Sequence, residues 1–176
     1  MYLEVKTGGT KMEMQKSCFS VLKGNRGEKI ERFLEKFLNY RKPEDFEARN
    51  VPCTVAADLE KNGIGYQVKG DRASFGLNGY QLTDDKTKDV QALVNHDQSD
   101  KFLLAGLWKK NSELHLFEIQ KDKFVQMVAE NPQVVHYSRN SKKNGGGKSL
   151  RLKVQVSKKE IYTRYADKIE TIQFVG

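Results

Sequence analysis

The dipeptide Asn62-Gly63 is the feature that most constrains how this chain can fold. It separates two runs of strand-like composition, 51–60 and 64–69, and an Asn-Gly pair in that position is a strong signal for a two-residue β-hairpin. In such a hairpin the residue numbers of two facing positions have the same sum as the numbers of the two turn residues. Asp58 is therefore expected directly opposite Gln67. Residues in that relation have Cβ atoms about 4.5–5.5 Å apart.

The predicted hairpin has one polar and one apolar face, because side chains alternate between the two sides of a strand. Lys69 joins Gln67 on the polar side, and the apolar side carries Leu59, Ile64, Tyr66 and Val68. Carboxylate, amide and backbone carbonyl oxygens are ligands that Mg²⁺ accepts, and an ammonium group can orient or deprotonate a water. The polar face, with the Val68 carbonyl beside it, therefore predicts hydrolysis of a phosphodiester bond.

The positive charge of the chain is concentrated in one segment. The 176 residues include 31 Lys and Arg against 23 Asp and Glu, a net charge of +8. Residues 139–159 hold eight basic side chains and no acidic one, so the other residues balance to zero. Such a local excess is expected of a surface that binds a polyanion, and nucleic acid is the leading candidate. The Gly-rich loop 139–149 and the strand after it are expected to contact phosphates, through Lys142, Lys143, Lys148, Arg151 and Lys153.

Several classes of protein are excluded by composition. The longest apolar stretches, such as 102–108, are too short to span a bilayer, and the N-terminal residues lack the apolar run of a signal peptide. We therefore expect a soluble, cytoplasmic protein without a small-molecule cofactor. The two cysteines are 35 residues apart and the three histidines lie about twenty residues from one another, so a structural zinc site is not expected. His96, His115 and His136 are each interpreted as structural.

Hydrophobic periodicity predicts a mixed α/β chain around one sheet. An amphipathic helix is expected over 25–38, where apolar residues recur at helical spacing and Asn25 with Glu28 forms a capping signature. Further helices are expected over 84–95, 121–130 and 158–171, and strands over 102–108, 114–119, 134–137 and 150–156, with an opening strand at residues 4–6. Alternation of helices with strands is typical of a single α/β domain.

The string Asp58-x8-Gln67-Val68-Lys69 resembles the active-site hairpin of the PD-(D/E)XK nuclease superfamily, which includes many restriction endonucleases and archaeal Holliday-junction resolvases. The helix before it is similar to the first helix of the resolvases, where a glutamate followed by an arginine completes the metal site; by position that glutamate is Glu31. The likeness spans about residues 26–75. Two departures are Ala57, where the superfamily often has proline, and Gln67, which replaces the usual acidic residue.

The resemblance implies a restriction-endonuclease-like core, with a mixed central sheet flanked by helices, in one nuclease domain over 1–176. It also implies a DNA endonuclease that uses Mg²⁺, with Mn²⁺ as an alternative. Glu31, Asp58 and Gln67 would hold the metal, and Lys69 would serve the attacking water. The implied assembly is a homodimer in which each subunit cuts one strand, leaving a 5′-phosphate and a 3′-hydroxyl.

Other interpretations of the same residues stay open. A module on the same fold that binds nucleic acid without cleaving it would use the basic segment alone, and an RNA-cleaving toxin nuclease would share the site but not the substrate. A polar hairpin face and a Gly-rich loop can also be merely solvated. Binding alone, however, requires neither Asp58 nor Lys69 on one face, and for this reason cleavage is the leading hypothesis.

Overall fold

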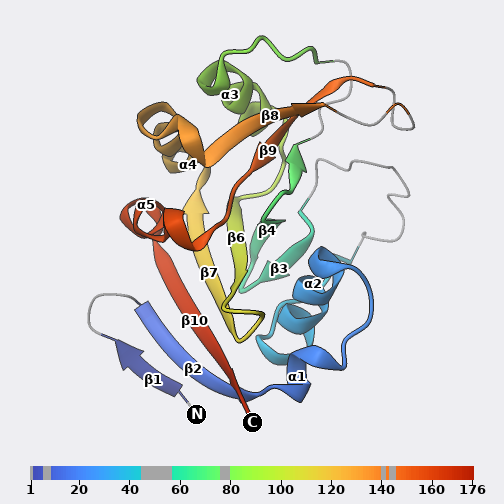
Figure 1. Cartoon of the computed structure of the whole chain (residues 1–176), viewed down its shortest axis with the longest axis vertical. Coiled ribbons are helices and arrows are strands. Elements are labelled where there is room, and N and C mark those ends of the chain that lie inside the picture. Colours follow the sequence, from blue (N-terminus) through green and yellow to red (C-terminus); the bar gives the residue numbers. More distant parts are fainter. Residues whose placement is uncertain (1, 6–8, 45–56, 76–79, 140–141, 143–145) are drawn as a thin grey trace.

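The computed structural model describes residues 2–5, 9–44, 57–75, 80–139, 142 and 146–176. Its described strands form two sheets (Figure 1). The large mixed sheet has the order β1 (Tyr2–Val5), β2 (Gly9–Gln15), β10 (Lys168–Val175), β7 (Glu113–Gln120), β6 (Lys101–Trp108), β4 (Ile64–Gly70) and β3 (Leu59–Lys61). The small antiparallel sheet has the order β5 (Ser74–Phe75), β9 (Lys148–Leu152) and β8 (Val135–Arg139). In the large sheet β10–β2 and β4–β6 are the parallel pairs.

The helices divide between the two faces of the large sheet. They are α1 (Ser17–Ser20), α2 (Arg26–Phe37), α3 (Lys86–His96), α4 (Lys121–Glu130) and α5 (Lys159–Tyr165), with 3₁₀ turns at Pro132–Val134 and Val156–Lys158. Figure 1 shows α2 beside the β3–β4 hairpin, whereas α3 and α4 lie next to the small sheet at the other end of the molecule. None of the helices in the described ranges is long and apolar enough to cross a membrane.

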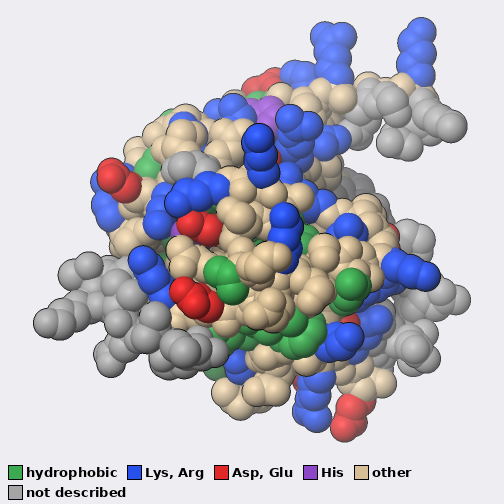
Figure 2. Space-filling model, turned by 60° about the horizontal axis from the view of Figure 1, so that its bottom comes forward, with side chains coloured by type: hydrophobic (Ala, Val, Ile, Leu, Met, Phe, Trp, Pro, Cys, Tyr) green, Lys and Arg blue, Asp and Glu red, His purple; other side chains and the backbone are tan. Residues whose placement is uncertain are grey.

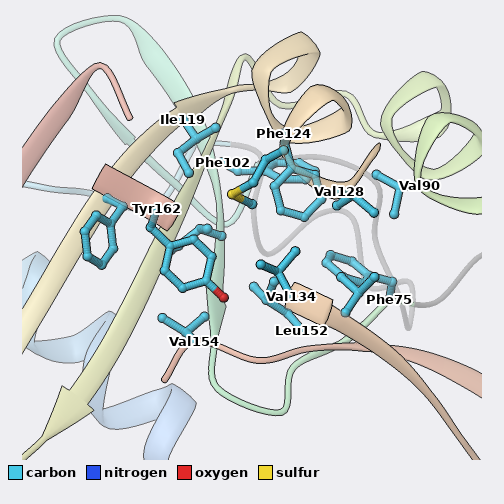
Figure 3. Close-up of a cluster of buried hydrophobic side chains, with 14 of the residues drawn as sticks. Phe75, Val90, Phe102, Ile119, Phe124, Val128, Val134, Leu152, Val154 and Tyr162 are labelled. Atoms are coloured by element: carbon cyan, nitrogen blue, oxygen red, sulfur yellow. The ribbon is translucent and has the colours of Figure 1, made fainter. Parts of the chain in front are cut away.

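Two hydrophobic clusters fill the space on either side of the large sheet. Along β6, Phe102 and Leu104 belong to one cluster and Leu103 to the other, as expected of a strand buried on both faces. The first cluster joins α3, α4 and α5 to the small sheet, and Figure 3 shows Phe124 of α4 and Phe75 of β5 within it. The second cluster packs α1 and α2 against the opposite face.

The sequence predictions for α2 and for the hairpin turn are confirmed. The Asn25 side chain accepts a hydrogen bond from the Glu28 amide at 3.0 Å and caps the helix. Asn62 and Gly63 have φ angles of 52° and 78°, as a type I′ turn requires, and Leu59 pairs with Tyr66 in the expected register.

The strand expected over 150–156 ends at Leu152, and two further expectations about the remaining elements are wrong. The helix expected over 158–171 ends at Tyr165, and Lys168–Val175 form β10. The four-residue spacing from Tyr165 to Ile169 suggested a helix, but Ile169 opens a β-branched and aromatic run that favours a strand in the middle of the sheet. The expectation of one sheet is also wrong, because β5, β8 and β9 pair only with one another and pack on the large sheet through side chains. A mixed α/β fold is confirmed at this level.

Candidate active site at the β3–β4 hairpin

Asp58 lies at the point where the hairpin ladder ends. Its backbone N–H donates to the carbonyl of Tyr66 at 2.9 Å, and its carboxylate oxygen Oδ2 accepts the Val68 N–H at 2.9 Å. The prediction that Asp58 stands directly opposite Gln67 is therefore wrong by one position. The regular pairing stops at Leu59, and the Asp58 carboxylate accepts the Val68 amide, which in the predicted register would donate to the carbonyl of Ala57. The carboxylate is nevertheless fixed beside the segment that carries Gln67.

Gln67 has a buried side chain whose amide oxygen has no hydrogen-bond donor. The residue is only 8% exposed, and Oε1 lacks a partner among the described residues. Leaving a buried acceptor without a donor costs about 1–3 kcal/mol, so such an atom calls for a physical explanation. An oxygen of this kind is a suitable ligand for a hard cation.

Lys69 projects from the same face of β4 as Gln67, as the alternation predicts. Tyr66 and Val68 alternate with them along the strand and point to the opposite face, where they contact the hydrophobic cluster under α2. The Lys69 ammonium donates to the carbonyl of Ser74 at 3.1 Å and lies 5.1 Å from the centre of the Phe75 ring. These contacts hold the amine next to the end of β4.

Glu31 on α2 approaches the hairpin from the face of β4 opposite to Gln67 and Lys69. A Cβ atom at Gly70 would come within 3.8 Å of Cδ1 of Ile30, so α2 packs on the face of β4 that carries Val68 and Gly70, opposite to the face of Gln67 and Lys69. Burial, and next the neighbouring Asp58 carboxylate, raise the pKa of Glu31 to about 7. The helix and the hairpin therefore bring together the two carboxyl groups that the sequence assigned to one site.

The motif assigns two carboxylates and one amide oxygen to a divalent cation, and of these the structure brings the Glu31 and Asp58 carboxyl groups close together. Within the described ranges, no group of three or more His, Cys, Asp or Glu side chains is placed to hold a metal ion. Glu31, Asp58 and Gln67 supply oxygen atoms only, which is the donor chemistry of Mg²⁺ or Mn²⁺ and not of zinc. A cation would relieve the repulsion between the Glu31 and Asp58 carboxyl groups, and the Gln67 oxygen, which has no donor among the described residues, lies on the other face of β4.

The basic segment does not form one continuous patch. Lys148 is paired with Asp84 at 3.0 Å, Arg151 and Lys153 line a hollow on the small sheet, and Lys159 lies over the Trp108 ring at 5.6 Å. Lys142 is exposed, and Lys143 lies outside the described residues. Strand pairing separates the charges because β9 alternates faces and the chain then turns away toward α5.

Arg72 is the basic residue that sequence reasoning missed. It lies outside the basic segment, yet its backbone carbonyl accepts a hydrogen bond from the Arg151 guanidinium at 3.3 Å. Only the pairing of β5 with β9 brings the two together across 79 residues. The available signal was the position of Arg72 three residues after Lys69, at the exit of the predicted active-site strand.

Two histidines lie away from the hairpin. His115 is buried, with Nε2 at 2.8 Å from Glu113 and Nδ1 at 3.2 Å from the Thr171 hydroxyl, and it stacks on Trp108. His96 is the last residue of α3. These contacts agree with a structural role.

Comparison of the chain with protein-family models, with curated proteins and with solved structures finds no match. The resemblance to PD-(D/E)XK nucleases thus stays a prediction from the motif residues.

Proposed function

We propose that this protein is a Mg²⁺-dependent DNA endonuclease with a restriction-endonuclease-like core, whose site consists of Glu31, Asp58, Gln67 and Lys69. The observation that carries the proposal is the Gln67 amide oxygen, which is buried and has no hydrogen-bond donor in the described part of the chain, at the position where the motif places a metal ligand. Glu31 and Asp58, predicted as the other ligands, lie close enough to interact electrostatically.

Each residue of the site has a chemical role in this proposal. Glu31, Asp58 and Gln67 hold the cation, which when bound supplies Lewis-acid polarisation of a phosphoryl oxygen. The Asp58 carboxylate is oriented by the Val68 amide, so its position is set before substrate arrives. Lys69 orients the attacking water or takes its proton, and the Ser74 carbonyl restricts where its amine can reach.

Binding of nucleic acid without cleavage is the second candidate. Two observations favour it: a third acidic ligand is missing among the described residues, and the Lys69 amine is hydrogen-bonded to Ser74. In either case basic side chains would position the duplex through its phosphates. A homodimer that cuts both strands belongs to the first candidate only.

Incubation of the purified protein with supercoiled plasmid separates the two candidates. The endonuclease should convert the plasmid to nicked and linear forms with Mg²⁺ or Mn²⁺ and leave it intact with EDTA. Ca²⁺, which accepts the same oxygen ligands, should support binding with little turnover. Plasmid that binds the protein but stays supercoiled with Mg²⁺ and Mn²⁺ would favour the binding module.

A further inference from the structure

The small sheet carries an open hollow of about 440 Å³ outside the hairpin site. This volume is within the range of about 300–1,000 Å³ typical of small-ligand pockets. All of its lining residues are described by the structure. They are Arg72, His136, Ser138, Arg139, Arg151, Lys153 and Gln155.

The base of the hollow is the outer face of the β8–β9 hairpin. His136 pairs with Arg151 and Ser138 with Ser149, and these side chains share one face of the small sheet. The alternate residues Leu150 and Leu152 point into the core on the other face. The polar groups therefore stand on a rigid strand pair rather than on the Gly-rich loop.

Arg151 is fixed in place by hydrogen bonds. Its Nε donates to the Ser138 hydroxyl at 2.7 Å and its Nη1 to the Arg72 carbonyl at 3.3 Å. The Arg72 amide in turn bonds the Leu152 carbonyl at 2.9 Å, which attaches the turn after β4 to β9. A guanidinium held in this way loses little conformational freedom when its other N–H groups bind an anion.

The hollow concentrates positive charge without an ion-pair partner. Four of its lining residues are Arg or Lys and none is acidic, and none of these four has an ion pair within the described part of the chain. His136 lies in their field. Burial, then Lys153 and Arg151, lower the pKa of His136, and Asp71 opposes this shift. Its Nδ1 atom is buried and has no hydrogen-bond partner among the residues that the structure describes. The upper part of Figure 2 shows Lys and Arg side chains gathered with a histidine among them.

We propose that this hollow is a phosphate-binding site, in which Arg151, Arg72, Arg139 and Lys153 receive one phosphate group of a nucleic acid. The assignment of nucleic acid as the source rests on the proposed function. Lys69 donates to the Ser74 carbonyl and Arg151 to the Arg72 carbonyl, and two residues of chain span at most about 7 Å. One strand can therefore contact the hairpin site and the hollow together.

The phosphate has two possible sources with the same chemistry: an internal phosphodiester near the cleaved bond, or a terminal 5′-phosphate.

The site should be tested with the variant Arg72→Gln/Arg139→Gln, which removes two charges and leaves Arg151 attached to Ser138. The matched control is Lys16→Gln/Lys110→Gln, which removes the same charge from two exposed positions in α1's N-cap and the β6–β7 turn.

The first measurement follows the His136 ring by NMR during titration with inorganic pyrophosphate. The wild type and the control should show a saturable shift of the His136 resonance with its pKa moving upward, and the Arg72→Gln/Arg139→Gln variant should lose affinity at least about tenfold. No shift in the wild type, or equal affinity in both double variants, would overturn the proposal.

The second measurement compares duplex binding in Ca²⁺ with and without 5′-phosphates. An internal phosphodiester predicts that the Arg72→Gln/Arg139→Gln variant flattens the plot of log K against log salt by up to about 0.9, the value of one phosphate contact, for both duplexes. A terminal phosphate predicts that only the wild type and the control prefer the phosphorylated duplex. Unchanged slope together with unchanged preference would contradict both sources.

The same variant separates failure of the hollow from failure of the proposed function. Thermal stabilisation by Mg²⁺ reports the hairpin site and should be equal in the wild type and the Arg72→Gln/Arg139→Gln variant. Pyrophosphate binding without any Mg²⁺ effect would retain the hollow and remove the metal site. Thermal stabilisation by Mg²⁺ without pyrophosphate binding would retain the metal site and remove the hollow.

Discussion

The carboxyl group of Glu31 on α2 lies close to the Asp58 carboxylate beside β3. Burial is the largest cause that raises the Glu31 pKa to about 7, and Asp58 is the next. The two residues are 27 positions apart in the chain. Glu35 adds to the rise in pKa, and Lys42 opposes it without cancelling the effect of Asp58. Repulsion of this kind is typical of functional sites, where a bound cation or proton relieves it.

Glu31→Gln should make the protein more stable at pH 8 and inactive. A native pKa near 7, above the ordinary 4.5, means that the folded protein binds more protons than the unfolded chain between these values. The contribution of Glu31 to stability is therefore present below pH 4.5 and is lost as pH rises through 7. The variant should lose this slope and gain on the order of 1 kcal/mol at pH 8, or about 2–4 °C in Tm.

Thermal melts from pH 4 to 8, with and without Mg²⁺, check this prediction. Mg²⁺ should raise the Tm of the wild type at pH 8 and leave that of Glu31→Gln unchanged, because protons and cations compete for the same carboxylate. Parallel plots of Tm against pH for the two proteins would show that the Glu31 carboxylate is not the group that destabilises the folded protein at high pH.

Substitution of Gln67 tests whether its amide oxygen is a ligand. Gln67→Leu removes the acceptor that has no donor from a site only 8% exposed, so stability should be equal or higher and cleavage should be lost. Gln67→Glu adds a carboxylate near Asp58; without metal it should be less stable at pH 8, and Mg²⁺ should restore stability and at least part of the cleavage. Full activity of the Leu variant would mean that Gln67 is only a hairpin side chain.

Lys69→Met should slow cleavage on the order of 100-fold while DNA binding in Ca²⁺ changes less than about twofold. Methionine keeps the contact with Phe75 and removes the ammonium that donates to Ser74. Lys61→Met is a matched control from the same hairpin, since the Lys61 amine also lies over an aromatic ring, that of Tyr40 at 4.8 Å. Equal rates for the two variants would remove Lys69 from the chemistry.

Asp84→Asn should strengthen DNA binding, because it frees Lys148 from its ion pair and removes a negative charge near the loop. The slope of log K against log salt should steepen by up to about 1, the value of one further phosphate contact. Asp122→Asn, at an exposed position in the first turn of α4, is the control with the same change in net charge. The same slope in both variants would exclude a contact between Lys148 and phosphate.

The elements that the sequence predicted well are those specified by short-range physics. Asn62-Gly63 forces its turn through the left-handed φ angles that these two residues tolerate, and α2 begins where Asn25 can cap it. The pairing of Asp58 was off by one because a side chain replaced a backbone partner at the end of the ladder. Residue spacing alone cannot show such a substitution.

The elements that the sequence did not predict depend on long-range pairing. β10 lies between β2 and β7, and only that central position reveals why Ile169 belongs to a strand. The hollow on the small sheet likewise requires Arg72 and Arg151 to meet across 79 residues. Charge counting found the basic segment, but strand pairing decides which of its side chains share a surface.

The central claim, cleavage of DNA by a cation held at Asp58, is tested most directly by Asp58→Asn beside Asp100→Asn. Both carboxylates accept a backbone N–H of β4, Asp58 from Val68 at 2.9 Å and Asp100 from Gly65 at 2.7 Å, and asparagine can keep either hydrogen bond. With supercoiled plasmid and Mg²⁺, the account predicts loss of nicking by on the order of 100-fold or more in Asp58→Asn and wild-type nicking in Asp100→Asn. Unchanged nicking in Asp58→Asn, with the fold intact by circular dichroism, would contradict the account and remove the hairpin from the mechanism.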